Sequence, residues 1–390
     1  MEPVQRKLAS IRKVAEIKPI DGADNIELAI VDGWQCIVKK GDFKPDDFCV
    51  YFEIDSFLPL RNEFEFLRKY SYKEMAGRGG FRLKTLRLRG QISQGLLMRV
   101  GDFKEIKRIA VEGLDVTDDL KVIKYEPPQK PVKGSTITNL PQANFPEFIR
   151  KTDLERVQNI WRRIQGCEET FEVSIKLDGT SCTFYWNNGK FGVCSRNWEI
   201  RDDNSLWRKT RSILSLAYNI LKAAVTLRFS RIPAIRSRFK INRPNNVYWE
   251  MANKYGIRDI LKSYGKNVAI QGEIVGENIQ CNPEKIKGHE FYLFDVFDID
   301  KQRYYSPVER DRFHAASFYY RDNPSIHHMP ILDGIDDKKI TDFKTINEVL
   351  AYAEGPSVKG EMREGLAFKS YTSNLRFKVV SNQYLLKNEQ

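Results

Sequence analysis

The sequence predicts an α+β protein with two domains, a small β-barrel followed by a larger domain of antiparallel sheets with flanking helices. The chain has 390 residues, more than a single hydrophobic core usually serves. Apolar and polar residues alternate in short runs up to about residue 125, and turn signals separate these runs. Strand-like and helix-like stretches are mixed in the remainder, as in α+β domains.

The predicted barrel is built from short strands and glycine turns. Residues 9–59 alternate in polarity and are broken at turn signals such as Gly33. A further strand pair is predicted from residues 81–89 and the stretch after Gly90, because glycine permits the tight bends of a small barrel. A five-stranded OB-like barrel therefore fits residues 1–125.

A linker is predicted at 126–146, because its prolines disfavour a helix and its glycine adds conformational freedom. The second domain then covers residues 147–390. Its expected strands are 171–177, 183–194, 247–251, 268–276, 291–298, 364–368 and 375–380. Its expected helices lie near 149–164, 207–227 and 308–319.

The charge balance favours a polyanionic partner such as nucleic acid. Lys and Arg total 64 against 52 Asp and Glu, for a net charge of +12. Much of this excess lies in residues 204–249, which lack acidic residues. Within this segment, residues 213–227 are apolar but interrupted by Asn219 and Lys222, which predicts a basic amphipathic helix. Either a solvated face or an RNA contact explains the segment. Its cations are Arg208, Lys209, Arg211, Lys222, Arg228, Arg231, Arg236, Arg238, Lys240 and Arg243.

Several classes of protein are disfavoured. The N-terminus lacks an apolar signal core, and no apolar run approaches the roughly 18 residues of a membrane span. The six cysteines have no CxxC spacing, and only four histidines are present, so no zinc cluster is expected. We therefore expect a cytoplasmic protein whose cysteines are reduced and mostly buried.

The sharpest local feature is Ser174-Ile-Lys176-Leu-Asp178-Gly179, in which a lysine ends an apolar strand before a carboxylate and a turn glycine. The string alone is a weak signal, because a plain strand ending explains it. A set of segments downstream raises its significance. In order they are Cys194-Ser-Arg196-Asn197, Gln271-Gly-Glu273, Phe291-Tyr-Leu-Phe294, Glu364-Gly365-Leu-Ala-Phe-Lys369 and Arg376-Phe-Lys378.

This order resembles the nucleotidyltransferase motifs of ATP-dependent polynucleotide ligases and mRNA capping enzymes. The segments around these motifs narrow the resemblance to the fifth RNA ligase family, in which the OB domain precedes the ligase domain. Segments that carry it include Leu88-Arg-Gly-Gln-Ile-Ser-Gln-Gly-Leu-Leu97, Lys151-Thr-Asp-Leu-Glu-Arg156 and Ser381-Asn-Gln-Tyr-Leu-Leu386. The resemblance covers nearly the whole chain except about 205–245.

The resemblance implies that Lys176 forms a covalent lysyl-AMP from ATP and that the AMP then moves to an RNA 5′-phosphate. A neighbouring RNA 3′-hydroxyl then displaces AMP. The carboxylates Asp178, Glu273 and Glu364 are expected to hold Mg²⁺ or Mn²⁺, hard cations that prefer oxygen ligands. An RNA ligase acting as a monomer, on nicks with an RNA 3′-OH strand, is the predicted function.

The resemblance also implies contacts to nucleotide and phosphate. Gly179 belongs to the nucleophile turn, Phe294 is expected to stack on adenine, and Arg196 to order the transferred phosphate. The remaining expected phosphate contacts are Arg156, Lys369, Arg376 and Lys378. Phe294 as ordinary core and Arg156 as a helix-surface residue are the alternatives. The sequence departs from the pattern in having Ile175 where many related ligases have Glu, and Arg376 where many have Lys.

Physical chemistry gives a second reason for cations near Lys176. A lysine is protonated at neutral pH, and desolvation or neighbouring cations must lower its pKa before it becomes nucleophilic. Lys369, Arg376 and Lys378 are the candidates for this effect. In the barrel, RNA contact and solvated strand-face charge explain four further cations equally well: Arg82, Lys84, Arg87 and Arg89.

Two alternatives remain open at this point. DNA ligases and capping guanylyltransferases use the same nucleophile pattern, but they usually carry the OB domain after the transferase domain. A non-catalytic RNA-binding protein would use the barrel and the basic segment alone. Such a protein has no physical need for Lys176, Asp178, Glu273 and Glu364 in their motif positions.

Overall fold

The computed structural model describes residues 6–126, 142–200, 202, 246–317, 324–332 and 338–388. The helix expected at 207–227, the basic segment up to residue 245 and most of the linker lie outside these residues.

Twelve short strands precede residue 127 in the described chain, more than the five expected. They are β1 (Ala9–Lys13), β2 (Glu16–Pro19), β3 (Ile26–Val31), β4 (Trp34–Lys39), β5 (Phe48–Phe52), β6 (Ser56–Pro59), β7 (Tyr72–Met75), β8 (Arg78–Arg82), β9 (Thr85–Leu88), β10 (Gln91–Gln94), β11 (Leu96–Arg99) and β12 (Ile123–Lys124). Residues at positive φ lie in several of the connecting turns. At Gly95, between β10 and β11, φ is 109° and a Cβ would lie 2.4 Å from the Phe52 carbonyl oxygen.

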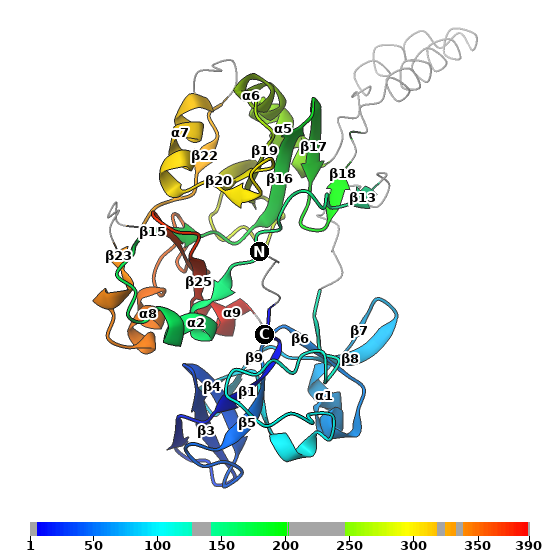
Figure 1. Ribbon diagram of the computed structural model, residues 1–390, viewed down its shortest axis with the longest axis vertical. Helices are drawn as coiled ribbons and strands as arrows, with labels where there is room; N and C mark the ends of the chain where they lie inside the picture. The colour runs from blue at the N-terminus through cyan, green and yellow to red at the C-terminus, as the bar shows by residue number, and fades with distance from the viewer. Residues whose placement is uncertain are drawn as a thin grey trace, which may run out of the picture.

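These strands form four small sheets, with the orders β1-β5-β11, β2-β3-β4, β9-β10 and β12-β6-β8-β7. Three short helices accompany them: η1 (Asn62–Leu67), α1 (Arg68–Ser71) and η2 (Val100–Asp102). Figure 1 shows this barrel as the lower part of the molecule.

Thirteen strands follow in the rest of the described chain. They are β13 (Gln142–Asn144), β14 (Glu155–Arg156), β15 (Thr170–Lys176), β16 (Thr180–Asn187), β17 (Lys190–Cys194), β18 (Trp198–Ile200), β19 (Val268–Gly276), β20 (His289–Asp298), β21 (Arg303–Tyr304), β22 (His327–His328), β23 (Lys338–Lys339), β24 (Gly365–Ser370) and β25 (Arg376–Val380). The helices are α2 (Val157–Ile164), α5 (Val247–Lys254), α6 (Ile257–Tyr264), α7 (Pro307–Ser317), η5 (Ile340–Asp342), α8 (Ile346–Tyr352) and α9 (Asn382–Asn388).

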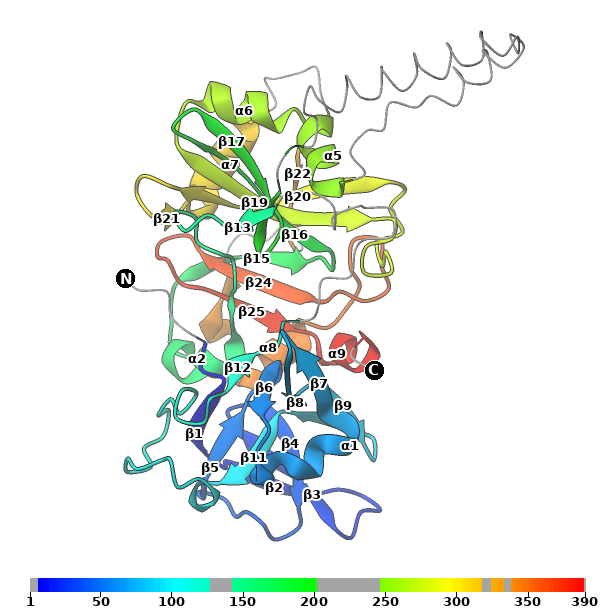
Figure 2. The ribbon, with the colours of Figure 1, turned by 90° about the vertical axis from the view of Figure 1, so that its right-hand side faces the viewer.

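Two larger sheets result. One has eight strands, β13-β18-β17-β16-β19-β20-β21 with β22 on β20, and the other has five, β14-β25-β24-β15-β23. Most neighbouring strands are antiparallel, as expected. Figure 2 shows β15, β24 and β25 between the eight-stranded sheet above and the barrel below.

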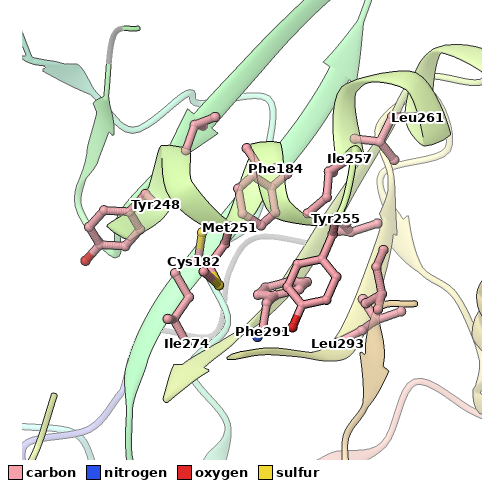
Figure 3. Close-up of a cluster of buried hydrophobic side chains, with 14 of the residues drawn as sticks. Cys182, Phe184, Tyr248, Met251, Tyr255, Ile257, Leu261, Ile274, Phe291 and Leu293 are labelled. Atoms are coloured by element: carbon pink, nitrogen blue, oxygen red, sulfur yellow. Dashed lines mark hydrogen bonds between the residues drawn. The ribbon is translucent and has the colours of Figure 1, made fainter. Parts of the chain in front are cut away.

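The eight-stranded sheet is covered on one face by α5 and α6. Figure 3 shows Met251 of α5 and Tyr255 after it packed against Phe184 and Phe291 of the sheet. Phe184 and Phe291 meet edge to face, with ring centroids 5.0 Å apart. This apolar layer holds the sheet that carries Glu273.

One predicted strand is wrong: residues 247–251 begin helix α5. Val247, Tyr248 and Trp249 have high strand propensity, which favoured the strand interpretation. The side chain of Asn246 caps the helix by accepting a hydrogen bond from the Tyr248 amide at 2.9 Å. Burial of the apolar side chains against the sheet then outweighs local propensity.

Other expected elements match more closely. The strand expected at 268–276 coincides with β19, and 183–194 divides into β16 and β17 at a tight turn. The helix expected from 149 begins at Val157, because the chain first pairs in β14. Four of the six cysteines are buried, which confirms the expectation of core positions. Within the described part of the chain, no helix has the length and apolar character of a membrane crossing.

Helices α2 and α9 connect the barrel to the five-stranded sheet. The Trp34 indole donates to Asn159 at 3.2 Å, and Arg162 pairs with Asp32 at 2.7 Å. On α9, Leu385 lies in the same apolar cluster as Trp34. These contacts fix the barrel next to the strand ends that carry the motif residues.

Candidate active site

Lys176 is the last residue of β15, a strand buried along most of its length. Antiparallel pairing with β24 places Lys176 opposite Gly365. The residue before β24, Glu364, therefore lies beside the lysine, and the Lys176 ammonium donates to Glu364 Oε2 at 2.5 Å. The structure thus brings together two motif residues that are 188 positions apart.

Glu273 comes from the other sheet. Residues 177–179 turn directly from β15 into β16, and β16 pairs with β19 so that Ser181 faces Glu273. A Cβ at Gly179 would lie 2.4 Å from the Ile274 carbonyl oxygen and 2.8 Å from Glu273 Cγ. Glycine is therefore required for the close approach of the nucleophile turn to β19.

Asp178 is held by the C-terminal helix. The hydroxyl of Tyr384 on α9 donates to Asp178 Oδ2. The same helix is tied to the barrel by a hydrogen bond from Gln94 Nε2 to Asn382 Oδ1 at 3.0 Å. The position of Asp178 therefore depends on an element that contacts both parts of the protein.

The carboxylates dominate the electrostatics around Lys176. Burial, together with Glu364, raises the pKa of Asp178 to about 6. Burial also raises the pKa of Glu273 to about 8, with Lys176 opposing the shift and Glu364 adding to it. Three acidic groups crowded in this way favour binding of a divalent cation.

The pKa of Lys176 is raised, contrary to the expectation that neighbouring cations lower it. Burial alone would lower it, but the attraction of Glu364 and Glu273 outweighs burial. The cations expected to lower the pKa of Lys176 do not do so, because each of them already pairs with another acid. Lys378 pairs with Asp153, and Lys369 and Arg376 pair with Asp295.

A cluster of cations lies on the barrel side of the site. The parallel pairing of β14 and β25 sets Arg156 beside Lys378. The Lys378 ammonium lies 3.2 Å from Asp153, which also accepts a hydrogen bond from Lys124 of β12. Burial lowers the pKa of Lys378 to about 8, with Asp153 opposing the shift. Burial alone would raise the pKa of Asp153, but the charges of Lys378 and Lys124 hold it well below its usual range. The exposed Arg196 lowers the pKa of Asp153 further.

Arg156 is buried at 6% exposure rather than lying on a helix surface. Its Nε and Nη1 have no hydrogen-bond partner among the described residues. The nearest carboxylates, Glu53 and Asp55, are both 3.9 Å away, beyond hydrogen-bond distance. A buried guanidinium with free N–H groups is a strong receptor for an anion.

Lys369, Arg376 and Phe294 form a separate group. Lys369 lies opposite Glu172, four residues before Lys176 on β15, or about 13 Å along the strand. Its buried ammonium lies 2.9 Å from Asp295 and donates to the Phe294 carbonyl. Arg376 lies 3.1 Å from the same aspartate. Phe294 is half-buried against the core of the five-stranded sheet.

The four barrel cations predicted to bind RNA do not share one environment. Arg82 stacks on Tyr125 at 4.6 Å and lies 3.7 Å from Asp55. Arg87 and Arg89 are exposed on the β9–β10 hairpin. Lys84 is half-buried between β8 and β9.

Comparison with known proteins assigns this arrangement to a family. A family model described as RNA ligase matches residues 169–380, and one described as OB-fold domain matches residues 8–100. The chain belongs to the RNA ligase family. The expected OB fold of the N-terminal part and the mixed α+β architecture are confirmed.

Solved structures of Naegleria gruberi RNA ligase resemble this RNA ligase over nearly its whole length. One in the apo state has 38% identity, a TM-score of 0.78 and 98% coverage of both chains. A lysine-to-alanine mutant with ATP and Mn has 39% identity, the same TM-score, and covers 98% of this chain and 99% of that one. A form with PPi has 38% identity, a TM-score of 0.77 and 99% coverage of both. No curated protein matches the chain.

Sequence reasoning missed three residues of this RNA ligase site: Asp153, Asp295 and Tyr384. All three contact a residue that was predicted, namely Lys378, Lys369 and Asp178. A signal was present for Asp153 and Tyr384, because both lie in segments that carry the family resemblance. For Asp295, the signal was its position directly after Phe294 within an apolar strand, where a buried acid needs a partner.

Proposed function

We propose that this RNA ligase uses ATP to join RNA 3′-hydroxyl and 5′-phosphate ends, through a lysyl-AMP on Lys176 and an adenylylated 5′ end, and that it seals nicks with an RNA 3′-OH strand. The observation that carries the proposal is the position of Lys176, at a strand end with Glu364 at 2.5 Å and two further carboxylates acting on it. A protein without catalytic activity would have no physical reason to keep these charged groups buried together, because burying charge costs free energy.

In the first step Lys176 Nζ attacks the α-phosphorus of ATP. The new N–P bond forms as the bond to the β-phosphate bridging oxygen breaks, and pyrophosphate leaves. The lysine must lose a proton, and Glu364 Oε2 is placed to accept it. The Nε and Nη1 atoms of Arg156 have no hydrogen-bond partner among the described residues, and we assign them to the departing phosphates.

Asp178, Glu273 and Glu364 fit a divalent cation, since their carboxylate oxygens suit Mg²⁺ or Mn²⁺. Burial, with the charge of Glu364 added to it, raises the pKa values of Asp178 and Glu273 when no cation is bound. Such a cation supplies charge neutralisation that lowers the pKa of Lys176 and stabilises negative charge on the α-phosphate.

In the second step an oxygen of the RNA 5′-phosphate attacks the phosphorus of the lysyl-AMP, and the bond to Lys176 Nζ breaks. In the third step the RNA 3′-hydroxyl oxygen loses its proton and attacks the RNA 5′-phosphorus, and AMP leaves. Lys378 and Arg196 bind the reacting phosphates. Phe294 stacks on adenine. Gly179 lets the turn after Lys176 pack closely against β19, which carries Glu273. Lys369 and Arg376 contact phosphate or, through Asp295, hold the strand that carries Phe294.

We also propose a division into an RNA-binding OB domain at 1–125, a linker at 126–146 and an adenylyltransferase domain at 147–390. The RNA contacts in the OB domain are Arg82, Lys84, Arg87 and Arg89. The enzyme acts as a monomer in the cytoplasm.

The test uses purified full-length protein with Mg²⁺ or Mn²⁺. Incubation with α-labelled ATP should give a labelled protein band on denaturing electrophoresis, whereas α-labelled GTP should give none. The protein should then seal a nick with an RNA 3′-OH strand faster than an all-DNA nick. A GTP adduct would favour a capping enzyme, equal sealing of all-DNA nicks would favour a DNA ligase, and no adduct with either nucleotide would contradict the proposal.

Metal binding is expected to depend on pH. The pKa of Glu273 is about 8 when folded, against an ordinary value of 4.5. The folded protein therefore binds more protons than the unfolded chain between these values, so the metal-free protein loses stability as pH rises through that window. A cation competes with the same protons and binds more tightly at higher pH.

Thermal melting with and without Mn²⁺ checks this expectation. The increase in melting temperature on adding Mn²⁺ should be larger at a pH of about 8.5 than at about 6. Glu273→Gln removes the titrating group and should flatten the dependence. A larger Mn²⁺ effect at the lower pH would contradict the assignment.

A further inference from the structure

An unusual concentration of exposed aromatic side chains lies on the barrel. Phe66 is 62% exposed, Tyr70 74% and Tyr72 37%. They fall within seven residues of η1, α1 and the start of β7, and they are three of the five aromatic residues most exposed in the described chain. Exposed aromatics gathered in this way indicate an interaction surface.

The local structure holds these rings in place. Tyr72 lies across the β7–β8 hairpin, where a Cβ at Gly79 would be 2.8 Å from its hydroxyl oxygen. The Arg68 guanidinium lies 5.3 Å from the Tyr72 ring, and the Lys69 ammonium 5.1 Å from the Tyr70 ring. Tyr70 and Tyr72 therefore each present a ring with a cation beside it.

The charge around the rings favours a polyanion. Arg68, Lys69 and Lys73 are exposed in α1 and β7, which contain one acid, Glu74. The two acids of η1 are each paired with an arginine, Glu63 with Arg61 at 2.8 Å. Glu65 in η1 pairs with Arg68 at 2.6 Å. Bases have π faces that stack on such rings, and phosphates pair with such cations.

The sheet that ends in β7 begins at the active site. Its order is β12-β6-β8-β7, and Lys124 of β12 donates to Asp153 beside Lys378. Tyr72 faces Phe81, and Phe81 faces Leu58, in register across the sheet. Three strand spacings separate β12 from β7, about 15 Å. Figure 1 shows β7 and β8 at the edge of the barrel on the side of β13 and β18.

We propose that Phe66, Tyr70 and Tyr72 form an aromatic platform on which single-stranded RNA bases stack as the strand leaves the active site. This rests on the proposed function, because it places the RNA substrate of that same site. A distance of about 15 Å corresponds to four or five nucleotides at 3.4 Å each. The platform therefore contacts only RNA that extends at least about four nucleotides past β12, the strand whose Lys124 contacts Asp153.

The test measures fluorescence anisotropy of labelled single-stranded RNA of 4 and 12 nucleotides with full-length protein. Phe66→Ala/Tyr70→Ala should weaken binding of the 12-mer by about tenfold or more and leave the 4-mer unchanged. Tyr70→Phe keeps the ring and should bind like wild type. Phe48→Ala is the matched control, because Phe48 is 39% exposed with Lys13 at 5.2 Å from its ring, but lies on β5 outside the platform.

Salt dependence separates stacking from charge. The double aromatic variant should keep the slope of log affinity against log salt, whereas Lys69→Ala/Lys73→Ala should reduce it. The platform proposal would be overturned if Phe66→Ala/Tyr70→Ala bound the 12-mer as tightly as wild type. It would also be overturned if Phe48→Ala lost as much affinity for the 12-mer as Phe66→Ala/Tyr70→Ala. A change of oligomeric state without a change of RNA affinity would instead make the surface an interface between copies and also overturn it.

Labelling with ATP is measured on the same samples. Failure of wild type to form an adduct or to seal RNA would contradict the proposed function. If wild type forms the adduct and seals RNA normally while Phe66→Ala/Tyr70→Ala keeps its RNA affinity, only the platform proposal is overturned.

Discussion

Replacing Lys176 with alanine is expected to abolish adduct formation with ATP and to lower RNA sealing by a factor on the order of 10⁴ or more, as for other covalent nucleophiles. The neighbouring lysine Lys378 cannot substitute, because it projects from β25 and pairs with Asp153. The same variant should still seal RNA that carries a pre-formed 5′-adenylyl group, since that step does not use the lysine as a nucleophile. Electrophoresis of labelled protein and of labelled RNA measures the two steps separately.

Two further variants sharpen the test of the nucleophile. Lys176→Arg retains the charge beside Glu364 but not the nucleophilic amine, and it should also form no adduct. Lys287→Ala removes an exposed lysine and should behave like wild type. A labelled band that persists in Lys176→Ala would show that another residue carries AMP.

Arg310→Met is expected to lower the free energy of unfolding by about 3–5 kcal/mol and the melting temperature by about 10 °C. Arg310 on α7 donates to Glu172 on β15 at 2.7 Å, and both side chains are at most 3% exposed. Removing the guanidinium leaves a buried carboxylate without its principal partner. Thermal and denaturant unfolding of the full-length protein measure the loss.

The surroundings of this pair provide the controls. Glu172→Leu/Arg310→Met removes both charges and should recover most of the lost stability. Arg303→Met breaks a pair with Glu309 in which both side chains are 36% exposed, so it should cost less than about 1 kcal/mol. If Arg310→Met cost no more than Arg303→Met, the pair would not stabilise the packing of α7 against β15.

The motif strands were predictable because buried strands leave a local pattern. Residues 268–276 and 375–380 read as apolar runs bounded by turn residues, and they form β19 and β25. The turn that follows Lys176 was predictable from the order of the motifs. Lys-x-Asp-Gly at a strand end is weak evidence alone, but the remaining motifs follow it in the order found in the family. Membership of the RNA ligase family therefore follows from the sequence, and the comparisons confirm it.

Local pattern failed where tertiary contacts set the outcome. Residues 247–251 have strand-forming side chains but form a helix, because Asn246 caps it and the eight-stranded sheet buries it. The partners of three predicted site residues were also missed, although Asp153 and Tyr384 lie in segments that carry the family resemblance. Asp153, Asp295 and Tyr384 reach their partners from distant parts of the chain, and no spacing rule connects them.

The sequence by itself determined the family and the set of residues proposed to carry the chemistry, because Lys176, its carboxylates and the cations lie in ordered motifs within recognisable strands. Only the tertiary structure decided how they act on one another. The pKa of Lys176 depends on Glu364 and Glu273, which two different sheets bring to the end of β15. Burial and distance set the strength of such interactions, and both arise only when the chain has folded.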